Sequence, residues 1–271
     1  MLAPVATLMI LGLLFGAGLA FASRVLAVKR DERIEAIEAM LPGVNCGGCG
    51  YAGCSAFSEA MVRGEASVMA CSVCSNEVLA KVAEILGEEI DTSAVKTVAL
   101  VCCWGTRDAA KARFSYSGIA DCAAMEAIAG GHKLCEYGCL GGGSCVDACP
   151  FGAITMGKEG IPVVDVDRCT GCGKCVEACP RDIIDMVPVN QPVLLLCRAE
   201  LGPRDARKVC SNACIGCGLC AKRCPQDAIT MKNHLPVVDF DKCDGCGICI
   251  QVCPADCLES GEVLLKQDRV G

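Results

Sequence analysis

The stretch CTGCGKCVEACP (169–180) carries four cysteines with the spacing C-x2-C-x2-C-x3-C and a proline directly after the fourth. The same spacing recurs in CIGCGLCAKRCP (214–225) and in CDGCGICIQVCP (243–254). Such a run is typical of chains that bind four-iron clusters through cysteine thiolates. The proline ends the short helix that carries the fourth cysteine and turns the chain. Three complete copies therefore predict iron–sulfur binding.

The composition supports metal binding over disulfide bonding. Cysteine accounts for 27 of the 271 residues, and aromatic residues for only 4%. Disulfide-rich domains are usually short and secreted, and their cysteine counts are even. Structural zinc sites pair C-x2-C knuckles or include histidine, and neither His132 nor His234 has the spacing of a ligand. The net charge of −7 argues against a nucleic-acid partner.

An internal repeat groups the cysteine runs in pairs. Residues 133–156 align with residues 208–231 without a gap, at an offset of 75 residues. Residues 161–184 then match residues 235–258 after a deletion of one residue. Self-similarity at a fixed offset indicates duplicated modules. Each copy is therefore predicted to be one two-cluster unit of short strands, turns and cysteine loops.

The repeat predicts an α+β fold class with two tandem bacterial two-cluster ferredoxin-like domains. We expect these domains over 133–188 and 208–258, a linker over 189–207 and a C-terminal tail over 259–271. In two-cluster ferredoxins the fourth cysteine of each run serves the other cluster. Three regular ligand sets follow, namely Cys169, Cys172, Cys175 with Cys149; Cys214, Cys217, Cys220 with Cys253; and Cys243, Cys246, Cys249 with Cys224.

The fourth run, CLGGGSCVDACP (139–150), lacks one cysteine because Gly142 stands in its place. Cys135 lies four residues before this run, at the position that aligns with the surplus Cys210 of the second copy. The simplest interpretation is a ligand shift, in which glycines 141–143 let the loop bulge. The predicted ligand set is then Cys135, Cys139, Cys145 and Cys179.

A different cysteine pattern precedes the repeat. CGGCGYAGC (46–54) and one later cysteine supply four thiolates for one [4Fe-4S] cluster, namely Cys46, Cys49, Cys54 and Cys71. The intervening SAFSEAMVRGEA (55–66) has a helical pattern that would return the chain to the loop. We therefore predict an N-terminal [4Fe-4S] domain over 44–90, with Cys74 as a buried spare thiol.

The first residues form an uncharged apolar segment. No charged side chain occurs before Arg24, and residues 5–23 are long enough to cross a bilayer as a helix, which takes about 20 residues. A signal peptide would carry a basic residue ahead of its apolar run, whereas here Arg24, Lys29 and Arg30 follow it. Residues 1–28 are therefore predicted to anchor the chain in the membrane, with the cysteine domains on the cytoplasmic side. An amphipathic linker helix is expected over 29–43.

The connecting segment 91–132 has less pattern. VKTVALVCCWG (95–105) suggests a strand ending at Cys102 and Cys103, and a later helix is expected to carry Cys122. We expect these three cysteines to be structural or spare thiols. A sixth cluster built from them is the alternative.

The order of apolar helix, CGGCGYAGC module and ferredoxin runs resembles the RnfB family, an iron–sulfur component of the Rnf-type membrane electron transport complex. The resemblance spans nearly the whole chain, and the N-terminal helix joined to the C-x2-C-x4-C-x16-C module is its most specific part. It implies a ferredoxin:NAD⁺ oxidoreductase coupled to Na⁺ or H⁺ translocation, in which this component takes electrons from soluble ferredoxin. Shorter members carry one ferredoxin domain, whereas this chain has two.

The sequence thus predicts an electron-transfer subunit with five [4Fe-4S] clusters and no complete catalytic site of its own. Its expected partners are the other membrane subunits of the complex and soluble ferredoxin. No nucleophile–base pair, phosphate loop or flavin motif is recognisable. The alternative is a stand-alone membrane-anchored polyferredoxin that serves another oxidoreductase.

Overall fold

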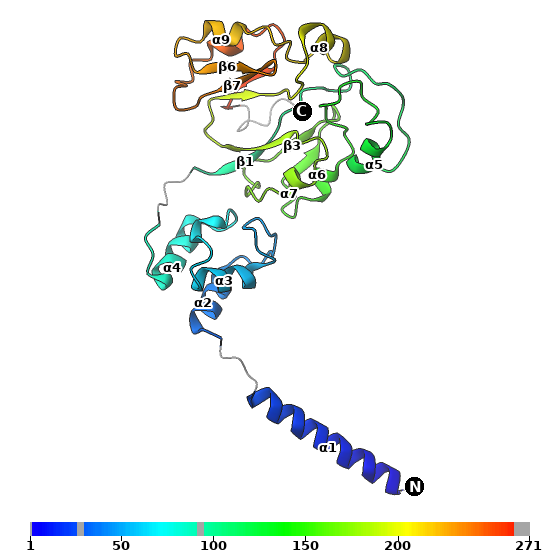
Figure 1. Cartoon of the computed structure of the whole chain (residues 1–271), viewed down its shortest axis with the longest axis vertical. Coiled ribbons are helices and arrows are strands. Elements are labelled where there is room, and N and C mark those ends of the chain that lie inside the picture. The colour runs from blue at the N-terminus through cyan, green and yellow to red at the C-terminus, as the bar shows by residue number, and fades with distance from the viewer. Residues whose placement is uncertain (1, 26–29, 91–94, 263–271) are drawn as a thin grey trace.

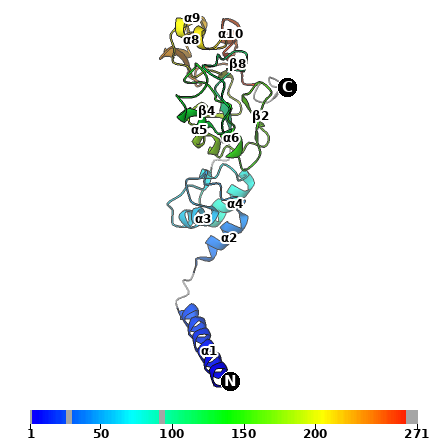
Figure 2. The same cartoon turned by 90° about the vertical axis from the view of Figure 1, so that its right-hand side faces the viewer.

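The structure, a computed structural model, describes residues 2–25, 30–90 and 95–262. The side chains of residues 2–7, 24 and 25 are not described. Parts of the predicted membrane anchor, connecting segment and C-terminal tail therefore lie outside the described residues. Three bodies follow one another along the long axis: the N-terminal helix, a small helical domain, and a larger part with short strands (Figures 1 and 2).

Helix α1 (Leu2–Val25) contains the uncharged segment. Its described side chains are exposed, including Leu8, Leu13 and Phe21. Within the described residues, no helix combines the length and the apolar character needed to cross a membrane.

The helical domain contains α2 (Glu32–Met40), α3 (Cys54–Val62), the 3-10 helix η1 (Val68–Ala70) and α4 (Asn76–Leu86). Asp31 caps α2 by accepting a hydrogen bond from the Arg33 amide at 2.9 Å. Ile37, Phe57 and Val82 are at most 1% exposed and form the centre of the core. Because these three side chains come from α2, α3 and α4, the linker helix expected over 29–43 is an integral part of the cysteine domain.

The two ferredoxin-like repeats each contain a short hairpin. β2 (Ile154–Met156) pairs with β3 (Pro162–Val164), and β6 (Ile229–Lys232) pairs with β7 (Leu235–Val238). In the second hairpin Lys232 pairs with Leu235, and both turn residues between them have positive φ. The one-residue deletion that separates the copies therefore lies in the hairpin turn. The cysteine runs contribute the short helices α6 (Ser144–Asp147), α7 (Lys174–Glu177), α9 (Leu219–Arg223) and α10 (Ile248–Gln251).

Each repeat is completed by a strand from the segment before it. β1 (Thr97–Val101) pairs with β4 (Ile184–Pro188), and β5 (Val193–Leu195) pairs with β8 (Leu258–Ser260). The structure thus differs from the expected linker over 189–207, since β5 and much of α8 (Pro203–Val209) lie there. The segment 91–132 likewise contributes β1 and α5 (Cys122–Ala127) to the first repeat. The reason is that each repeat's last strand needs a partner for its backbone groups.

The two repeats contact each other through the chain on either side of α8. Ala110 forms an isolated antiparallel bridge with Cys210, and the amide of Ser211 donates to the carbonyl of Ala109 at 3.0 Å. The amide of Lys111 donates to the carbonyl of Val209 at 2.9 Å. These bonds join segments of the two repeats that are far apart in sequence.

Candidate metal centres

The four cysteine runs share one loop conformation. Two glycines in each run have positive φ, which favours glycine because it has no Cβ. These glycines are Gly141 and Gly143, Gly171 and Gly173, Gly216 and Gly218, and Gly245 and Gly247. The run that lacks a cysteine therefore keeps the regular loop and does not bulge.

Cys122 occupies the position of the missing cysteine. A Cβ placed on Gly142 would lie 3.1 Å from the Cys122 sulfur and 2.8 Å from its backbone nitrogen. Gly142 has to lack a side chain here because Cys122 passes so close. The sulfur thus lies next to the position from which the regular ligand would extend.

Hydrogen bonds hold Cys122 against the run. Its amide donates to the Ser144 hydroxyl at 2.7 Å, and that hydroxyl donates to the Asp121 carboxylate at 2.9 Å. Asp121 also caps α5 by accepting from the Ala124 amide at 2.8 Å. The segment is tied to the run at Ser144, the first residue of α6.

A second connection joins α5 to the loop after Cys179. Arg181, whose side chain is only 7% exposed, forms an ion pair with Glu126 at 2.5 Å. Arg181 also donates to the carbonyl of Gly130. Both ends of the α5 segment are therefore fastened to the first repeat.

Four cysteines line one small apolar cavity of about 370 Å³ in this repeat: Cys122, Cys139, Cys145 and Cys179. Burial raises the pKa of Cys139 and of Cys145 to about 12, and neighbouring thiols contribute to the shift. Thiolates in such a cavity need a cation for compensation, which a bound iron cluster supplies. The donor set and the cavity thus fit an iron–sulfur cluster.

Cys135 does not lie in this cavity. It packs in a different core cluster together with Cys197 and Cys210. The structure therefore differs from the predicted ligand shift: it brings Cys139, Cys145 and Cys179 together as expected, but with Cys122. The sequence carried a weak signal for this, since a helix bearing Cys122 was expected just before the defective run.

The second repeat has two comparable cavities. One, of about 320 Å³, is lined by Cys214, Cys217, Cys220, Cys253 and the additional Cys257. The other, of about 330 Å³, is lined by Cys224, Cys243, Cys246 and Cys249. The structure thus brings together both predicted ligand sets of this repeat.

Cys257 is a surplus thiol beside the first of these cavities. Its sulfur lies 3.6 Å from that of Cys253, and it also hydrogen bonds to Cys214. These bonds lower the pKa of Cys253 to about 5 and that of Cys214 to about 7, while they strongly raise the pKa of Cys257. Cys257 therefore stays protonated and donates to its two neighbours.

The remaining set of the first repeat follows the same plan. Cys169 and Cys172 neighbour Cys175, whose pKa burial raises to about 11. Cys149 packs against the same buried core as Cys169 and Cys175. Its sulfur accepts from the Ala153 amide at 3.3 Å, and in the other repeat Cys224 accepts from Ala228 at 3.4 Å.

The helical domain gathers its own cysteines. Cys49, Cys54, Cys71 and Cys74 pack against its core, and Cys46 neighbours Cys74. A hydrogen bond from Cys74 lowers the pKa of Cys71 to about 6 and strongly raises that of Cys74. Cys74 therefore behaves as the protonated spare beside Cys71.

The helical domain touches the first repeat at a cysteine loop. A Cβ on Gly48 would lie 2.9 Å from the carbonyl oxygen of Cys172 and 3.2 Å from its Cβ. Lys174 bridges the same contact, because its raised pKa reflects mainly Glu177 but also the thiols of Cys172 and Cys46. The contact brings the loop of Cys46 and Cys49 against that of Cys172.

The spacing of the sulfurs suits clusters better than single ions. Within the described ranges, no three Cys, His, Asp or Glu side chains converge closely enough to hold one metal ion. A tetrahedral zinc ion would draw its sulfurs to about 2.3 Å from one centre. A four-iron cluster binds each thiolate at a different iron, so its ligands lie further apart.

Family comparisons agree with this assignment. Residues 41–73 match the family described as "Putative Fe-S cluster". Residues 135–191 and residues 206–260 each match a family described as "4Fe-4S dicluster domain". The prediction of tandem ferredoxin-type domains is thereby confirmed.

Curated relatives span nearly the whole chain. The B subunit of the Na(+)-translocating ferredoxin:NAD(+) oxidoreductase complex of Acetobacterium woodii is 47% identical over 97% of this chain and 78% of the relative. Its proton-translocating counterpart from Clostridium ljungdahlii is 44% identical over 85% of this chain and 81% of the relative. The corresponding component of the ion-translocating oxidoreductase complex of Methanosarcina acetivorans is 40% identical over 76% and 78%. The chain therefore belongs to the RnfB family, the B subunits of ion-translocating ferredoxin:NAD(+) oxidoreductase complexes.

Proposed function

We propose that this chain relays electrons from reduced ferredoxin to the other subunits of an ion-translocating ferredoxin:NAD⁺ oxidoreductase complex. The observation that carries the proposal is the series of four-cysteine cavities in two repeats, joined to a third cysteine domain through the Gly48–Cys172 contact. Bound iron–sulfur clusters supply reversible one-electron transfer. The family membership supplies the reaction in which that transfer is used.

We propose five ligand sets for the described sites. Four are those expected from the sequence: Cys46, Cys49, Cys54, Cys71; Cys169, Cys172, Cys175, Cys149; Cys214, Cys217, Cys220, Cys253; and Cys243, Cys246, Cys249, Cys224. The fifth set contains Cys122 with Cys139, Cys145 and Cys179, in place of the expected Cys135. Its support is the cavity that these four side chains line and the position of Cys122 beside Gly142.

The protein's own residues hold each site dry and rigid. Backbone amides such as those of Ala153 and Ala228 donate to the ligand sulfurs, which stabilises the thiolate form. The positive-φ glycines bring the loop backbone around each site. Rigid ligation of this kind limits the structural change that accompanies gain or loss of an electron.

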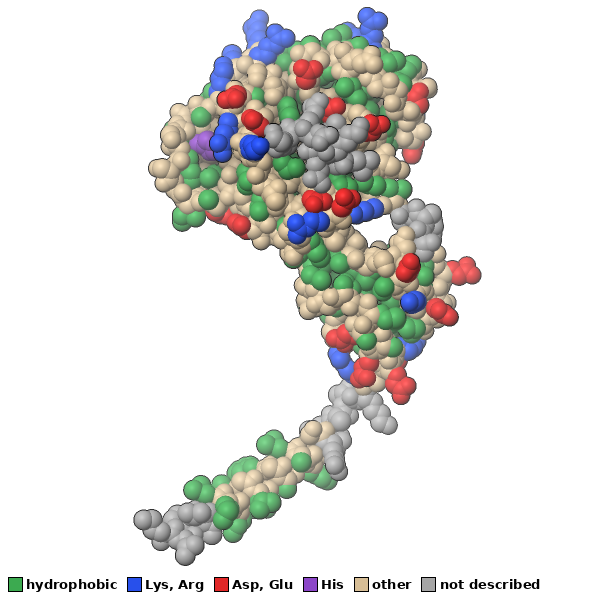
Figure 3. Space-filling model, turned by 180° about the vertical axis from the view of Figure 1, so that it is seen from behind, with side chains coloured by type: hydrophobic (Ala, Val, Ile, Leu, Met, Phe, Trp, Pro, Cys, Tyr) green, Lys and Arg blue, Asp and Glu red, His purple; other side chains and the backbone are tan. Residues whose placement is uncertain are grey.

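We also propose that α1 anchors the chain in the membrane with the cysteine domains on the cytoplasmic side. The support is the absence of charged residues before Arg24 and the basic Arg24, Lys29 and Arg30 after the apolar run. Hydrophobic side chains cover the part of α1 that is coloured in Figure 3. Protease treatment of right-side-out vesicles tests the sidedness, since digestion of the cysteine domains from outside would contradict it.

The relay function is tested with purified full-length chain under anaerobic conditions. Reduced ferredoxin should bleach the visible absorbance of the bound clusters within the mixing time of a rapid-kinetics experiment. NAD⁺ added without partner subunits should leave the bleached chain reduced. Efficient NADH formation by this chain alone would contradict the proposal, and so would a failure of ferredoxin to reduce it.

A further inference from the structure

Four cysteines outside the five sites form two equivalent pairs. The sequence repeat aligns Cys135 with Cys210. The strands align Cys103 with Cys197, because Val101 pairs with Ile184 in the first repeat as Leu195 pairs with Leu258 in the second. Each repeat thus contributes one cysteine just after its added strand and one just before its first run.

All four side chains are buried at the junction of the repeats. Their exposed fractions are 7% for Cys103, 6% for Cys135, 8% for Cys197 and 5% for Cys210. The sulfurs of Cys103 and Cys210 lie 3.4 and 3.8 Å from one point, the position of a Cβ on Gly105. Cys103 and Cys210 both neighbour Cys135, and Cys103 also neighbours Cys197. Cysteines from both repeats therefore converge on one place.

Backbone amides point at these sulfurs in the same way in both repeats. Cys103 accepts from the Cys139 amide at 3.3 Å, and Cys197 accepts from the Cys214 amide at 3.3 Å. Within the sequence repeat Cys139 and Cys214 are equivalent. Amides that donate to sulfur favour the thiolate, as expected of a metal ligand and not of a spare thiol.

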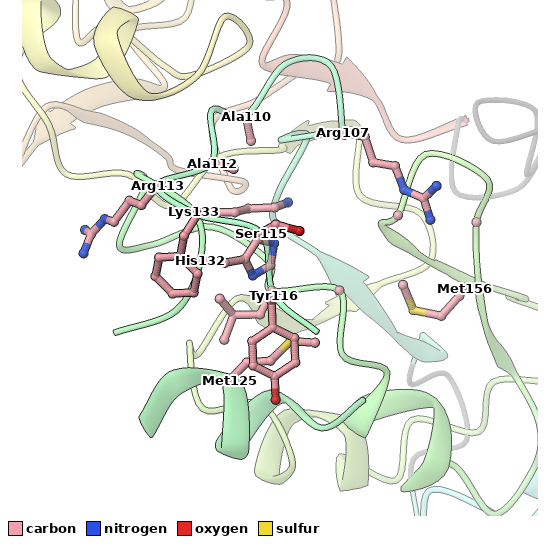
Figure 4. A pocket seen from close by; sticks show the side chains of 15 residues that line it. Arg107, Ala110, Ala112, Arg113, Ser115, Tyr116, Met125, His132, Lys133 and Met156 are labelled. Atoms are coloured by element: carbon pink, nitrogen blue, oxygen red, sulfur yellow. The ribbon is translucent and has the colours of Figure 1, made fainter. Parts of the chain in front are cut away.

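A buried positive charge lies beside the group. Lys133 is 7% exposed, and its ammonium donates to the carbonyl of Gly105 at 2.9 Å. In the described part of the chain no carboxylate lies within ion-pair distance of it. Figure 4 shows Lys133 and Arg113 extending in opposite directions from their neighbouring strands. A buried ammonium needs an anionic neighbour, and a thiolate-ligated cluster is net anionic.

We propose that Cys103, Cys135, Cys197 and Cys210 hold a sixth [4Fe-4S] cluster at the junction of the two repeats. The amide contacts place it next to Cys139 in the first repeat and next to Cys214 in the second. It thus connects one site of each ferredoxin-like domain. The assignment rests on the four side chains, and only its role as a connecting centre rests on the proposed relay function.

The count of metal in the full-length wild-type chain tests the site without any substitution. Native mass spectrometry with iron and acid-labile sulfide analysis should give about 24 iron atoms per chain, against about 20 for five clusters. A count of about 20 in fully loaded chain, or zinc in place of the additional iron, would overturn the proposal. Ferredoxin reduction is measured on the same sample: about 24 irons without bleaching contradicts the relay, whereas bleaching with about 20 contradicts the sixth site.

Substitutions then locate the additional cluster. Cys103→Ser and Cys197→Ser should each lower the iron content by one to four atoms, and the double variant should lose about four and no more, because both residues serve one cluster. Cys102→Ala is the matched control, since Cys102 is buried beside Cys103 but aligns with Leu196 of the second repeat. Full iron in both single variants, or a loss of about eight in the double variant, would refute the shared site.

Discussion

Replacing Cys122 by serine is the most direct test of how the incomplete run is repaired. The structure places the Cys122 sulfur 3.1 Å from where a Gly142 Cβ would lie and in one cavity with Cys139, Cys145 and Cys179. Loss of one of four thiolates should open or remove one cluster, so iron should fall by one to four atoms per chain. The electron paramagnetic resonance spectrum of the oxidised variant should show a three-iron signal if one iron leaves.

The alternative ligand Cys135 is tested by combining substitutions. If Cys122 and Cys135 serve different clusters, Cys122→Ser and Cys135→Ser should lower the iron content additively. If both belonged to one cluster, the double variant would lose no more than about four irons. Unchanged iron and spectra in Cys122→Ser would refute the reasoning from the cavity.

A steric variant tests the same site without removing a thiol. Gly142→Ala would put a methyl group 2.8 Å from the Cys122 nitrogen and 2.9 Å from the Asp121 carbonyl carbon, so the backbone of this segment must move. Overpacking of this kind costs about 1–3 kcal/mol, which corresponds to about a 5- to 150-fold loss of the docked arrangement. The expected result is slower cluster assembly and faster extraction of iron by a chelator. Gly202→Ala is the control, because no atom lies within 4 Å of a Cβ at that position; equal extraction rates in the two variants would contradict the prediction.

Three further expectations follow from the contacts. Ser144→Ala removes the hydroxyl that holds the Cys122 amide and should lower stability by about 1–3 kcal/mol; iron loss to a chelator should accelerate, and an unchanged rate would show that the tether is unimportant. Gly48→Ala would place a methyl group 2.9 Å from the Cys172 carbonyl oxygen; iron content should stay complete while electron transfer between the helical domain and the first repeat slows, and an unchanged rate in rapid-mixing measurements would contradict the contact as a route. Burial raises the pKa of Cys139, Cys145 and Cys197 to about 12 from 9.0; because the unfolded thiols ionise first, the metal-free chain should lose stability as pH rises from 9 towards 12, by at most about 1.4 kcal/mol per pH unit and thiol, and denaturant titrations that show no loss over this range would refute it.

The sequence alone determined the kind of protein and most of the ligand sets. The information in a C-x2-C-x2-C-x3-C-P run is local, because the spacing, the glycines and the proline together define one loop and one short helix. The same loop conformation is accordingly found in all four runs, including the one that lacks a cysteine. The family follows from the order of these patterns along the chain.

Only the tertiary structure decided where the isolated cysteines go. Cys122 and Cys135 both precede the defective run, and their distance along the chain does not say which of them approaches Gly142. The docking of α5 through Ser144 and Arg181 decides it, and this depends on side chains from separate segments. Cys103 and Cys197 likewise become equivalent only when β1 and β5 pair with the last strands of the two repeats. Contacts between distant segments form on folding and leave no fixed spacing in the sequence, which is why the regular runs were legible and the single cysteines were not.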